Sequence, residues 1–252
     1  ILQKITLHDT LYFTLKKNGV SITTDHPSLP VGKSNLVYKA ARAILKRSGY
    51  KGGVRIEIKK RIPLGAGLGG GSSNAATTLK ALNQLLKTNL SQRELMEMGV
   101  EIGTDVPFFF LEGAAIGLGV GERLKRIELP GLWFVLIYPN FEVSTRWAYQ
   151  SFILTKRQFH FNLHEFLRTP EGIASILSND LEGVVSKRYP QIDIMKKIIY
   201  SAGALGTLMT GSGPTVFGVF SEEGDASKAY KKIKNRIRGK GWIVLKAQSF
   251  LA

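Results

Sequence analysis

The sequence has no cysteine and no long apolar run. The missing cysteine excludes disulfides, thiolate catalysis and zinc–thiolate centres. A membrane-spanning helix needs about 20 apolar residues, whereas the longest apolar stretches, residues 106–111 and 132–139, have the length of buried strands. We therefore expect no membrane partner and a cytoplasmic location.

Acidic residues are scarce relative to basic ones. The 252-residue chain has 35 Lys and Arg against 19 Asp and Glu, a formal net charge of +16. Such a charge suits nucleic acid or small anionic ligands, but the densest basic cluster, residues 231–240, fits the solvated face of a helix. Because no nucleic-acid-binding motif accompanies it, we expect no nucleic-acid partner. The pair His160 and His164 lacks the intervening Glu of a zinc-protease helix, so a metal site there is not expected.

Glycine, in contrast, is concentrated in one stretch. Residues 62–76 read IPLGAGLGGGSSNAA, and they follow residues 54–60, whose alternation of apolar and polar side chains predicts a half-buried strand. Behind the glycines, helical spacing relates the apolar residues Ala75, Ala76, Leu79, Leu82, Leu85 and Leu86. Glycines at a strand–helix junction let backbone N–H groups converge on a ligand, and the first helical turn adds positive charge. The pattern predicts a phosphate-binding loop.

Two widespread phosphate-binding motifs do not fit this loop. Residues 65–70 satisfy G-x-G-x-x-G, but a dinucleotide fold also needs an acidic residue about 20 positions later, and residues 85–93 contain none. A P-loop needs Gly-Lys-Ser/Thr, which is missing as well. A flexible linker is disfavoured because Pro63 stiffens one side and a helix begins on the other.

The remaining pattern predicts an α+β protein with a domain boundary near residue 139. Before the boundary we predict strands at 2–7, 11–17, 20–24, 106–111 and 133–138, with a hairpin turn at Asn18-Gly19 and a further hairpin at 114–129. The predicted helices there are one capped by Ser34 or Asn35 that ends near Gly49 and a capping-box helix from Ser91 to about Gly99. After the boundary we predict a helix carrying Thr145 and Tyr149, helices near 179–182 and 190–202, strands at 205–209 and 215–220, a helix at 225–238 and a strand at 242–248. Residues 158–169 have no pattern to which a role can be assigned.

An acidic residue stands immediately ahead of an apolar run in the segment Gly103-Thr-Asp-Val-Pro-Phe-Phe-Phe110. Because Pro107 fixes the backbone beside it, Asp105 is a candidate for a partly desolvated carboxylate. From the residues alone, a role for Asp105 in a turn or a helix cap is equally compatible.

Three segments together resemble the GHMP kinases, the small-molecule kinases named for galactose, homoserine, mevalonate and phosphomevalonate. The loop from Pro63 to Ser73 resembles their second motif, residues 103–109 resemble the segment that carries their catalytic aspartate, and residues 210–214 resemble their third motif. The longer glycine run, followed by Asn74-Ala-Ala, resembles the branch that acts on 4-diphosphocytidyl-2-C-methyl-D-erythritol in the non-mevalonate route to isoprenoids. The resemblance implies a two-domain fold, with a ribosomal S5 domain 2-like domain at residues 1–139 and a ferredoxin-like α/β domain at residues 140–252.

The resemblance also implies transfer of the γ-phosphate of ATP, with Mg²⁺, to the 2-hydroxyl of that substrate. Asp105 would be the catalytic residue, and Thr145 and Tyr149 would bind the substrate, with Tyr149 stacking on the cytosine. A hydroxyl of Ser72 or Ser73 would reach Mg²⁺ or a phosphate. The implied ATP-binding residues are Asn35, Pro63, Leu64, Gly65, Ala66, Gly67, Leu68, Gly69, Gly70, Gly71, Ser72 and Ser73, and the third-motif loop contains Gly211, Ser212 and Gly213.

Several of these assignments have alternatives. A helix cap explains Asn35 equally well, a buried packing role would explain Tyr149, and a simple hairpin turn would explain Gly211 and Gly213. The family's first motif, with a catalytic lysine and a Gly-Tyr-His segment, has no counterpart here, so we expect roughly 25 to 30 further residues before Ile1. A sister kinase acting on homoserine or a mevalonate derivative, and a non-catalytic nucleotide- or nucleic-acid-binding module, are the alternative functions. We expect a monomer or a weak homodimer.

Overall fold

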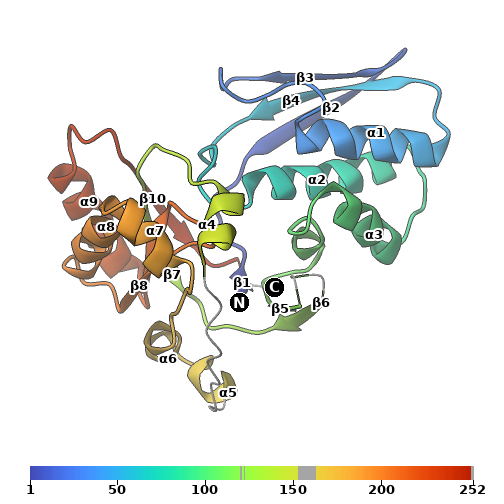
Figure 1. Cartoon of the computed structure of the whole chain (residues 1–252). Coiled ribbons are helices and arrows are strands. Elements are labelled where there is room, and N and C mark those ends of the chain that lie inside the picture. The colour runs from blue at the N-terminus through green and yellow to red at the C-terminus, as the bar shows by residue number, and fades with distance from the viewer. Residues whose placement is uncertain (120, 122, 153–162, 251–252) are drawn as a thin grey trace.

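A computed structural model describes residues 1–119, 121, 123–152 and 163–250, which form an N-terminal and a C-terminal half (Figure 1). The first half contains β1 (Leu2–Gln3), β2 (Thr10–Lys16), β3 (Val20–Thr24), α1 (Leu36–Ser48), β4 (Gly53–Lys59), α2 (Gly70–Leu85), α3 (Gln92–Ile102), the 3-10 helix η1 (Pro107–Phe110), β5 (Ala114–Leu118) and β6 (Arg123–Ile127). The second half contains β7 (Trp133–Tyr138), α4 (Thr145–Ser151), α5 (Leu163–Phe166), α6 (Pro170–Ser175), α7 (Glu182–Arg188), α8 (Gln191–Tyr200), β8 (Gly206–Met209), β9 (Val216–Phe220), α9 (Glu223–Arg236) and β10 (Ile243–Gln248). Both halves mix helices and strands, which confirms the predicted α+β class.

In the N-terminal half, α1 and α2 pack against a sheet with the strand order β2-β4-β3 (Figure 1). The alternation in the sequence of β4 has the expected effect, because Val54, Ile56 and Ile58 are fully buried. They share one core with the apolar faces of α1 and α2, including Ile44 and Leu79. This core fixes the end of β4 and the start of α2, and the glycine loop connects the two.

The predicted hairpin between β2 and β3 is wrong. The chain does turn at Gly19, where φ is 69°, but β4 lies between the two strands, antiparallel to β2 and parallel to β3. The turn contacts the start of β4, since Val54 N donates to Gly19 O at 2.9 Å. The central place suits β4 because its apolar side chains are fully buried, whereas the edge strand β2 exposes 55% of Tyr12.

A small sheet with the order β1-β5-β6 lies below α2 in Figure 1. The hairpin predicted for residues 114–129 forms β5 and β6, which pair antiparallel. The strand predicted for residues 2–7 is shorter, because only β1 pairs with β5. Beyond it, Ile5 forms an isolated bridge with Ser249, and Thr6 N donates to Gln248 O at 2.9 Å. The first residues of the chain therefore contact its last described strand.

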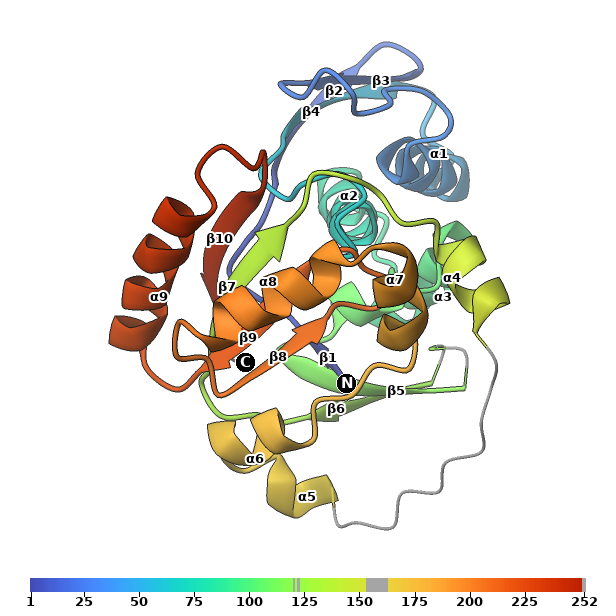
Figure 2. The same ribbon diagram turned by 60° about the vertical axis from the view of Figure 1, so that its left-hand side comes forward.

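The sheet of the C-terminal half has the order β10-β7-β9-β8, and all neighbouring strands are antiparallel. Helices α8 and α9 cover one face (Figure 2), where Ile137, Met195 and Ile233 belong to a common core. Strand β7 pairs with both β9 and β10. Residues 133–138, which precede the predicted boundary at 139, therefore belong to the sheet of the C-terminal half.

Two local predictions before the boundary are also corrected. Residues 107–110 form η1 rather than a strand, with Pro107 at its first position, where the fixed φ of proline suits a helix. Helix α3 continues to Ile102 instead of ending near Gly99. Gly99 lies inside the helix and packs closely on Val106, because a Cβ there would lie 3.0 Å from Cγ1 of Val106.

Candidate active site

The glycine loop connects the end of β4 to the start of α2, as the sequence predicts. Gly65, Gly67 and Gly69 have left-handed backbone conformations, with φ of 62°, 71° and 65°. Other residues adopt this conformation only at an energetic cost. The loop therefore needs glycine at these three alternate positions in order to turn into α2.

The first turn of α2 is open to a ligand. Its N-cap is Gly69, so no side chain of the N-cap residue accepts a hydrogen bond from the first turn, and that turn contains no acidic residue. The first bond within the helix runs from Ser73 N to Gly69 O at 2.9 Å, so the N–H groups of Gly70, Gly71 and Ser72 have no acceptor in the helix. Three open N–H groups at the positive end of a long helix are suited to bind an anion such as phosphate.

A cavity of about 460 Å³ lies along this loop. The loop residues from Pro63 to Ser72 line one part, and Leu29, Leu36 and Ile58 add an apolar wall. A nucleotide needs both kinds of surface, because its base is largely apolar and its phosphates are charged. Among the described residues, the lining includes Ser72 but not Ser73.

Asn35 caps α1 and also lines the cavity. Its Oδ1 accepts a hydrogen bond from Val37 N at 2.8 Å, and its Nδ2 donates to Pro30 O at 2.6 Å. The cap interpretation of Asn35 is therefore confirmed. The same bonds hold the side chain at the apolar end of the cavity.

The C-terminal half contacts the glycine loop directly. Tyr138, at the end of β7, donates its hydroxyl hydrogen to Leu64 O at 2.8 Å. Burial raises the pKa of this phenol, and the nearby Glu142 raises it further. Glu142 also packs on the loop, since a Cβ at Gly65 would lie 2.2 Å from its Cγ. The loop is thus held by both halves.

The predicted third-motif loop meets the glycine loop. A Cβ at Gly67 would lie 2.5 Å from Gly213 O, so these two backbones approach as closely as only glycine allows. Ser212 and the predicted substrate residue Thr145 share a hydrogen bond between their hydroxyls at 2.9 Å, and Thr145 lines the cavity. The third-motif loop connects β8 and β9, as a simple hairpin turn would. It also contacts the glycine loop and, through Ser212, the predicted substrate residue Thr145.

Asp105 lies in the turn between α3 and η1, with an exposed side chain. Its carboxylate has no hydrogen-bond or ion-pair partner in the described part of the chain, so the predicted cap role is wrong, whereas the predicted place in a turn is confirmed. Because the side chain is exposed, the predicted partial desolvation of the carboxylate is wrong as well. The helix η1 that follows it packs on the loop, because a Cβ at Gly69 would lie 2.9 Å from Cζ of Phe109. An unpaired carboxylate is thus placed on a segment that contacts the phosphate-binding loop.

The aromatic side chain of Tyr149 is 64% exposed, so the alternative of a buried packing role is wrong. Trp147 packs instead, with its ring 6.0 Å from that of Tyr189 and 4.6 Å from the guanidinium of Arg188. Both aromatics lie on α4, which confirms the helix predicted to carry Thr145 and Tyr149 and has Ser144 as its N-cap. The ring of Tyr149 is therefore available to a ligand.

Comparison with known proteins agrees with this geometry. Residues 35–113 match the GHMP kinases N terminal domain, and residues 163–239 match the GHMP kinases C terminal domain. The chain belongs to the GHMP kinase family.

Relatives of this GHMP kinase carry more specific names. The 4-diphosphocytidyl-2-C-methyl-D-erythritol kinase of Syntrophus aciditrophicus (strain SB) is 47% identical over 232 residues, which are 91% of this chain and 83% of the relative. A crystal structure of 4-(cytidine 5'-diphospho)-2C-methyl-D-erythritol kinase is 32% identical with a TM-score of 0.83, covering 98% of this chain and 88% of that chain. The homoserine kinase of Cytophaga hutchinsonii ATCC 33406 shares the fold, with 24% identity, a TM-score of 0.75 and coverage of 96% and 86%. The predicted two-domain fold is confirmed.

The sequence interpretation missed a buried charge pair beneath the loop of this GHMP kinase. Asp9 and Lys60 form an ion pair at 2.7 Å, with side chains 0% and 4% exposed. A sequence signal existed for Lys60, which directly precedes the loop and ends an alternating strand. Asp9 gave none, because its partners lie 51 to 65 positions away along the chain.

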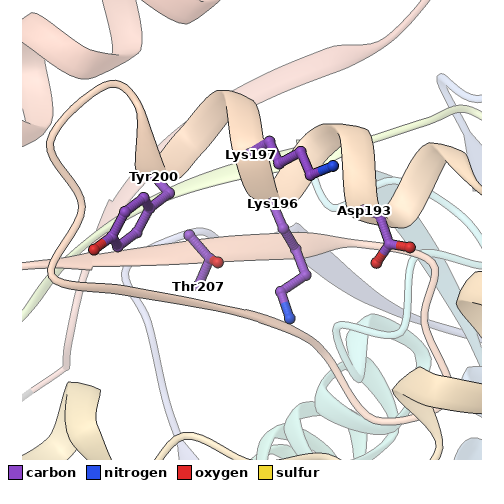
Figure 3. Close-up of a pocket in the computed structure, with 5 residues that line it drawn as sticks. All are labelled: Asp193, Lys196, Lys197, Tyr200 and Thr207. Atoms are coloured by element: carbon purple, nitrogen blue, oxygen red, sulfur yellow. The ribbon is translucent and has the colours of Figure 1, made fainter.

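A second hollow, of about 400 Å³, lies in the C-terminal half on α8 and β8. Figure 3 shows Lys196 and Lys197 pointing in different directions, with Asp193 at one end and Tyr200 at the other. Lys196 is already paired with Glu182. None of the residues predicted for the site lines this hollow, so the cavity at the glycine loop remains the candidate site.

The described residues, 1–119, 121, 123–152 and 163–250, contain neither a cluster of metal ligands nor a membrane-spanning helix. That part of the chain contains no group of three or more His, Cys, Asp or Glu residues that could hold a metal ion. His160 and the side chain of His164 lie outside it. Within the same residues, no helix is long and apolar enough to span a membrane.

Proposed function

We propose that this GHMP kinase transfers the γ-phosphate of ATP to the 2-hydroxyl of 4-diphosphocytidyl-2-C-methyl-D-erythritol, a step of the non-mevalonate route to isoprenoids in the cytoplasm. The observation that carries the proposal is the cavity at the glycine loop, where N–H groups that have no acceptor in α2 meet an apolar wall. The substrate follows the names of the relative and the solved structure described above.

We assign the cavity to ATP and Mg²⁺. Leu29, Leu36 and Asn35 would hold the base, and the N–H groups of Gly70–Ser72 would hold the phosphates. We assign the contact with Mg²⁺ to Ser72 rather than Ser73, because Ser72 lines the cavity. When bound, ATP supplies the phosphoryl group and Mg²⁺ neutralises part of its charge.

Asp105 is the residue that we assign to proton transfer. As the substrate hydroxyl oxygen forms its bond to phosphorus and the bond to the ADP oxygen breaks, the hydroxyl proton passes to the Asp105 carboxylate. The side chain is exposed and has no partner in the described chain, so a lone pair is available. Its place on the segment that leads into η1 supports this role.

The substrate side of the site is assigned to α4. Tyr149 would stack on the cytosine with its exposed ring, and Thr145 would bind near the diphosphate or ribose. The hydroxyl bond between Thr145 and Ser212 supports this placement, because it holds α4 beside the third-motif loop. We propose that the chain divides into the two domains 1–139 and 140–252, with β7 contributing to the second sheet.

A comparison of alcohol substrates tests the proposal. We expect kcat/KM for 4-diphosphocytidyl-2-C-methyl-D-erythritol to exceed that for homoserine or mevalonate by at least about 10³-fold, because hydrogen-bonding sites reject substrates that leave them unpaired. Comparable kcat/KM values for homoserine or mevalonate would instead support a GHMP kinase that acts on one of those alcohols. Absent turnover, together with nucleic-acid affinity that falls steeply with salt and is unchanged in Asp105→Ala, would support a binding module instead.

A further inference from the structure

Asp9 is a buried carboxylate that binds both ends of the glycine loop. Its side chain is 0% exposed. At the loop's beginning, Oδ1 accepts hydrogen bonds from the backbone N–H groups of Arg61 at 2.7 Å and Ile62 at 2.9 Å. Beyond the loop, in α2, Asn74 Nδ2 donates to Oδ2 at 2.8 Å. One side chain therefore connects the segment before the glycines with the helix after them.

Lys60 completes this cluster. Its Nζ donates to Asp9 Oδ2 at 2.7 Å and also to Ile62 O. It lies under the start of α2, because a Cβ at Gly70 would be 3.3 Å from Nζ. Burial by itself raises the pKa of Asp9, but the hydrogen bonds from Lys60, Arg61, Ile62 and Asn74 outweigh burial and lower the pKa below its usual value. The carboxylate is therefore ionised at neutral pH.

We propose that Asp9 is a positioning residue of the nucleotide site, which rests on the proposed function of the loop as the ATP site. By holding Ile62 and Asn74 at a fixed separation, Asp9 sets where the loop turns into α2. The N–H groups of Gly70, Gly71 and Ser72 then converge on one place. Asp9 itself touches no ligand and acts through the backbone that it holds.

The direction of the effect separates positioning from simple electrostatics. A negative charge near a phosphate site repels the phosphate, so electrostatics alone predicts tighter nucleotide binding when Asp9 becomes Asn. Positioning predicts weaker binding, because an amide at this place offers one acceptor oxygen instead of two and turns an NH₂ group toward other donors. The two accounts thus differ in sign.

The test is calorimetric titration of ADP with Mg²⁺, which needs no turnover. We expect Asp9→Asn to raise the Kd for ADP at least about tenfold, the scale of a lost buried polar contact, while the Kd for 4-diphosphocytidyl-2-C-methyl-D-erythritol changes less than about twofold. The matched control is Asp25→Asn. Asp25 also accepts a bond at the beginning of the loop, from Lys60 N at 2.8 Å, but makes no bond to α2, so this variant should bind ADP like the unchanged protein.

A variant without the buried charges guards against loss of folding. If Asp9→Asn does not fold, Asp9→Asn combined with Lys60→Met removes both charges and leaves neither unpaired. Because Lys60 lines the cavity, this double variant is compared with Lys60→Met alone, and it should bind ADP more weakly than Lys60→Met does. Unchanged or tighter ADP binding by either folded variant overturns the role of Asp9 while the proposed function stands. If the unchanged protein binds no ADP, the proposed function and the role of Asp9 are both overturned.

Discussion

At the scale of single residues, the candidate site divides into side chains that are held and side chains that are free. Asn35 and Asp9 are held by hydrogen bonds to the backbone. Asp105 and Tyr149 are exposed, and the Asp105 carboxylate is unpaired in the part of the chain that the structure describes. The free side chains are the ones to which we assign chemistry and substrate binding.

Replacing Asp105 tests its assignment to proton transfer. We expect Asp105→Asn to lower kcat by about 10²- to 10⁴-fold, the range that a general base contributes, with little change in the KM for ATP. Steady-state kinetics measures both constants. The control is Asp193→Asn, an exposed aspartate on α8, which should keep full activity. A wild-type kcat in Asp105→Asn contradicts the assignment.

Replacing Tyr149 tests the stacking role. A base stacked on an aromatic ring gains about 1–3 kcal/mol, so Tyr149→Ala should raise the KM for the cytidine substrate by roughly 5- to 150-fold. Tyr149→Phe keeps the ring and should change the KM little. Tyr200, also 64% exposed, provides the control Tyr200→Ala. If both alanine variants have the same KM, Tyr149 does not stack on the substrate.

The sequence indicated the residues of the site that belong to contiguous motifs. The glycine run predicted the loop Pro63–Ser73, and the acid ahead of an apolar run made Asp105 a candidate, because both patterns are visible in a short window. Thr145 was predicted only from the resemblance to the GHMP kinases. The sequence did not indicate Asp9 or the contact of Tyr138 with Leu64, since both depend on partners more than 50 positions away. Long-range pairing needs the fold before it can be seen.

At the scale of elements, the site depends on one junction, where β4 ends and α2 begins. The alternating β4, the glycine run and the apolar face of α2 are local patterns, so this junction was predicted correctly. The order of the strands was not, because the Asn18-Gly19 turn is compatible with a hairpin. Only the burial of β4 between its neighbours excludes that pairing.

Adding one methyl group to the loop tests this junction. Gly67→Ala places a Cβ 2.5 Å from Gly213 O at a φ of +71°, which combines a clash with a strained backbone costing about 1–3 kcal/mol. We expect at least about a tenfold loss of kcat/KM for ATP. Gly224→Ala lies in α9 with open space around it, and we expect it to keep activity and to gain up to about 1 kcal/mol of stability. Equal activity of the two variants contradicts the close approach.

At the scale of the whole molecule, the two halves meet on the glycine loop. Tyr138, Glu142 and Gly213 contact it from the C-terminal half, and Asp9 and Lys60 from the N-terminal half. The sequence predicted two domains of the right class. It could not show that both hold the same loop, because contacts between domains leave no periodic pattern.

The pH dependence of stability provides a test at this scale. Burial, and to a lesser extent repulsion from Lys80, lower the pKa of Lys4; Glu112 opposes the decrease, and the net pKa is about 8. Below pH 8 the ammonium group of Lys4 is charged in both the folded and the unfolded protein, and burying this charge destabilises the folded state. As the pH rises from about 8 toward 10.5, the folded protein loses this proton first, so the destabilisation disappears.

We therefore expect the free energy of unfolding of the unchanged protein, relative to Lys4→Met, to increase between about pH 7.5 and 9.5. Urea unfolding at both pH values measures the difference. Lys228→Met, at an exposed lysine of α9, should show no such change. A difference between the unchanged protein and Lys4→Met that stays constant with pH contradicts the lowered pKa.

The measurement that tests the central claim most directly is ADP formation by the full-length gene product with ATP and Mg²⁺, with and without 4-diphosphocytidyl-2-C-methyl-D-erythritol. We predict that ADP forms only when this alcohol is present, with one phosphorylated product for each ADP. ADP formation at the same rate without the alcohol would show an ATPase. No ADP with the alcohol would contradict the proposed reaction.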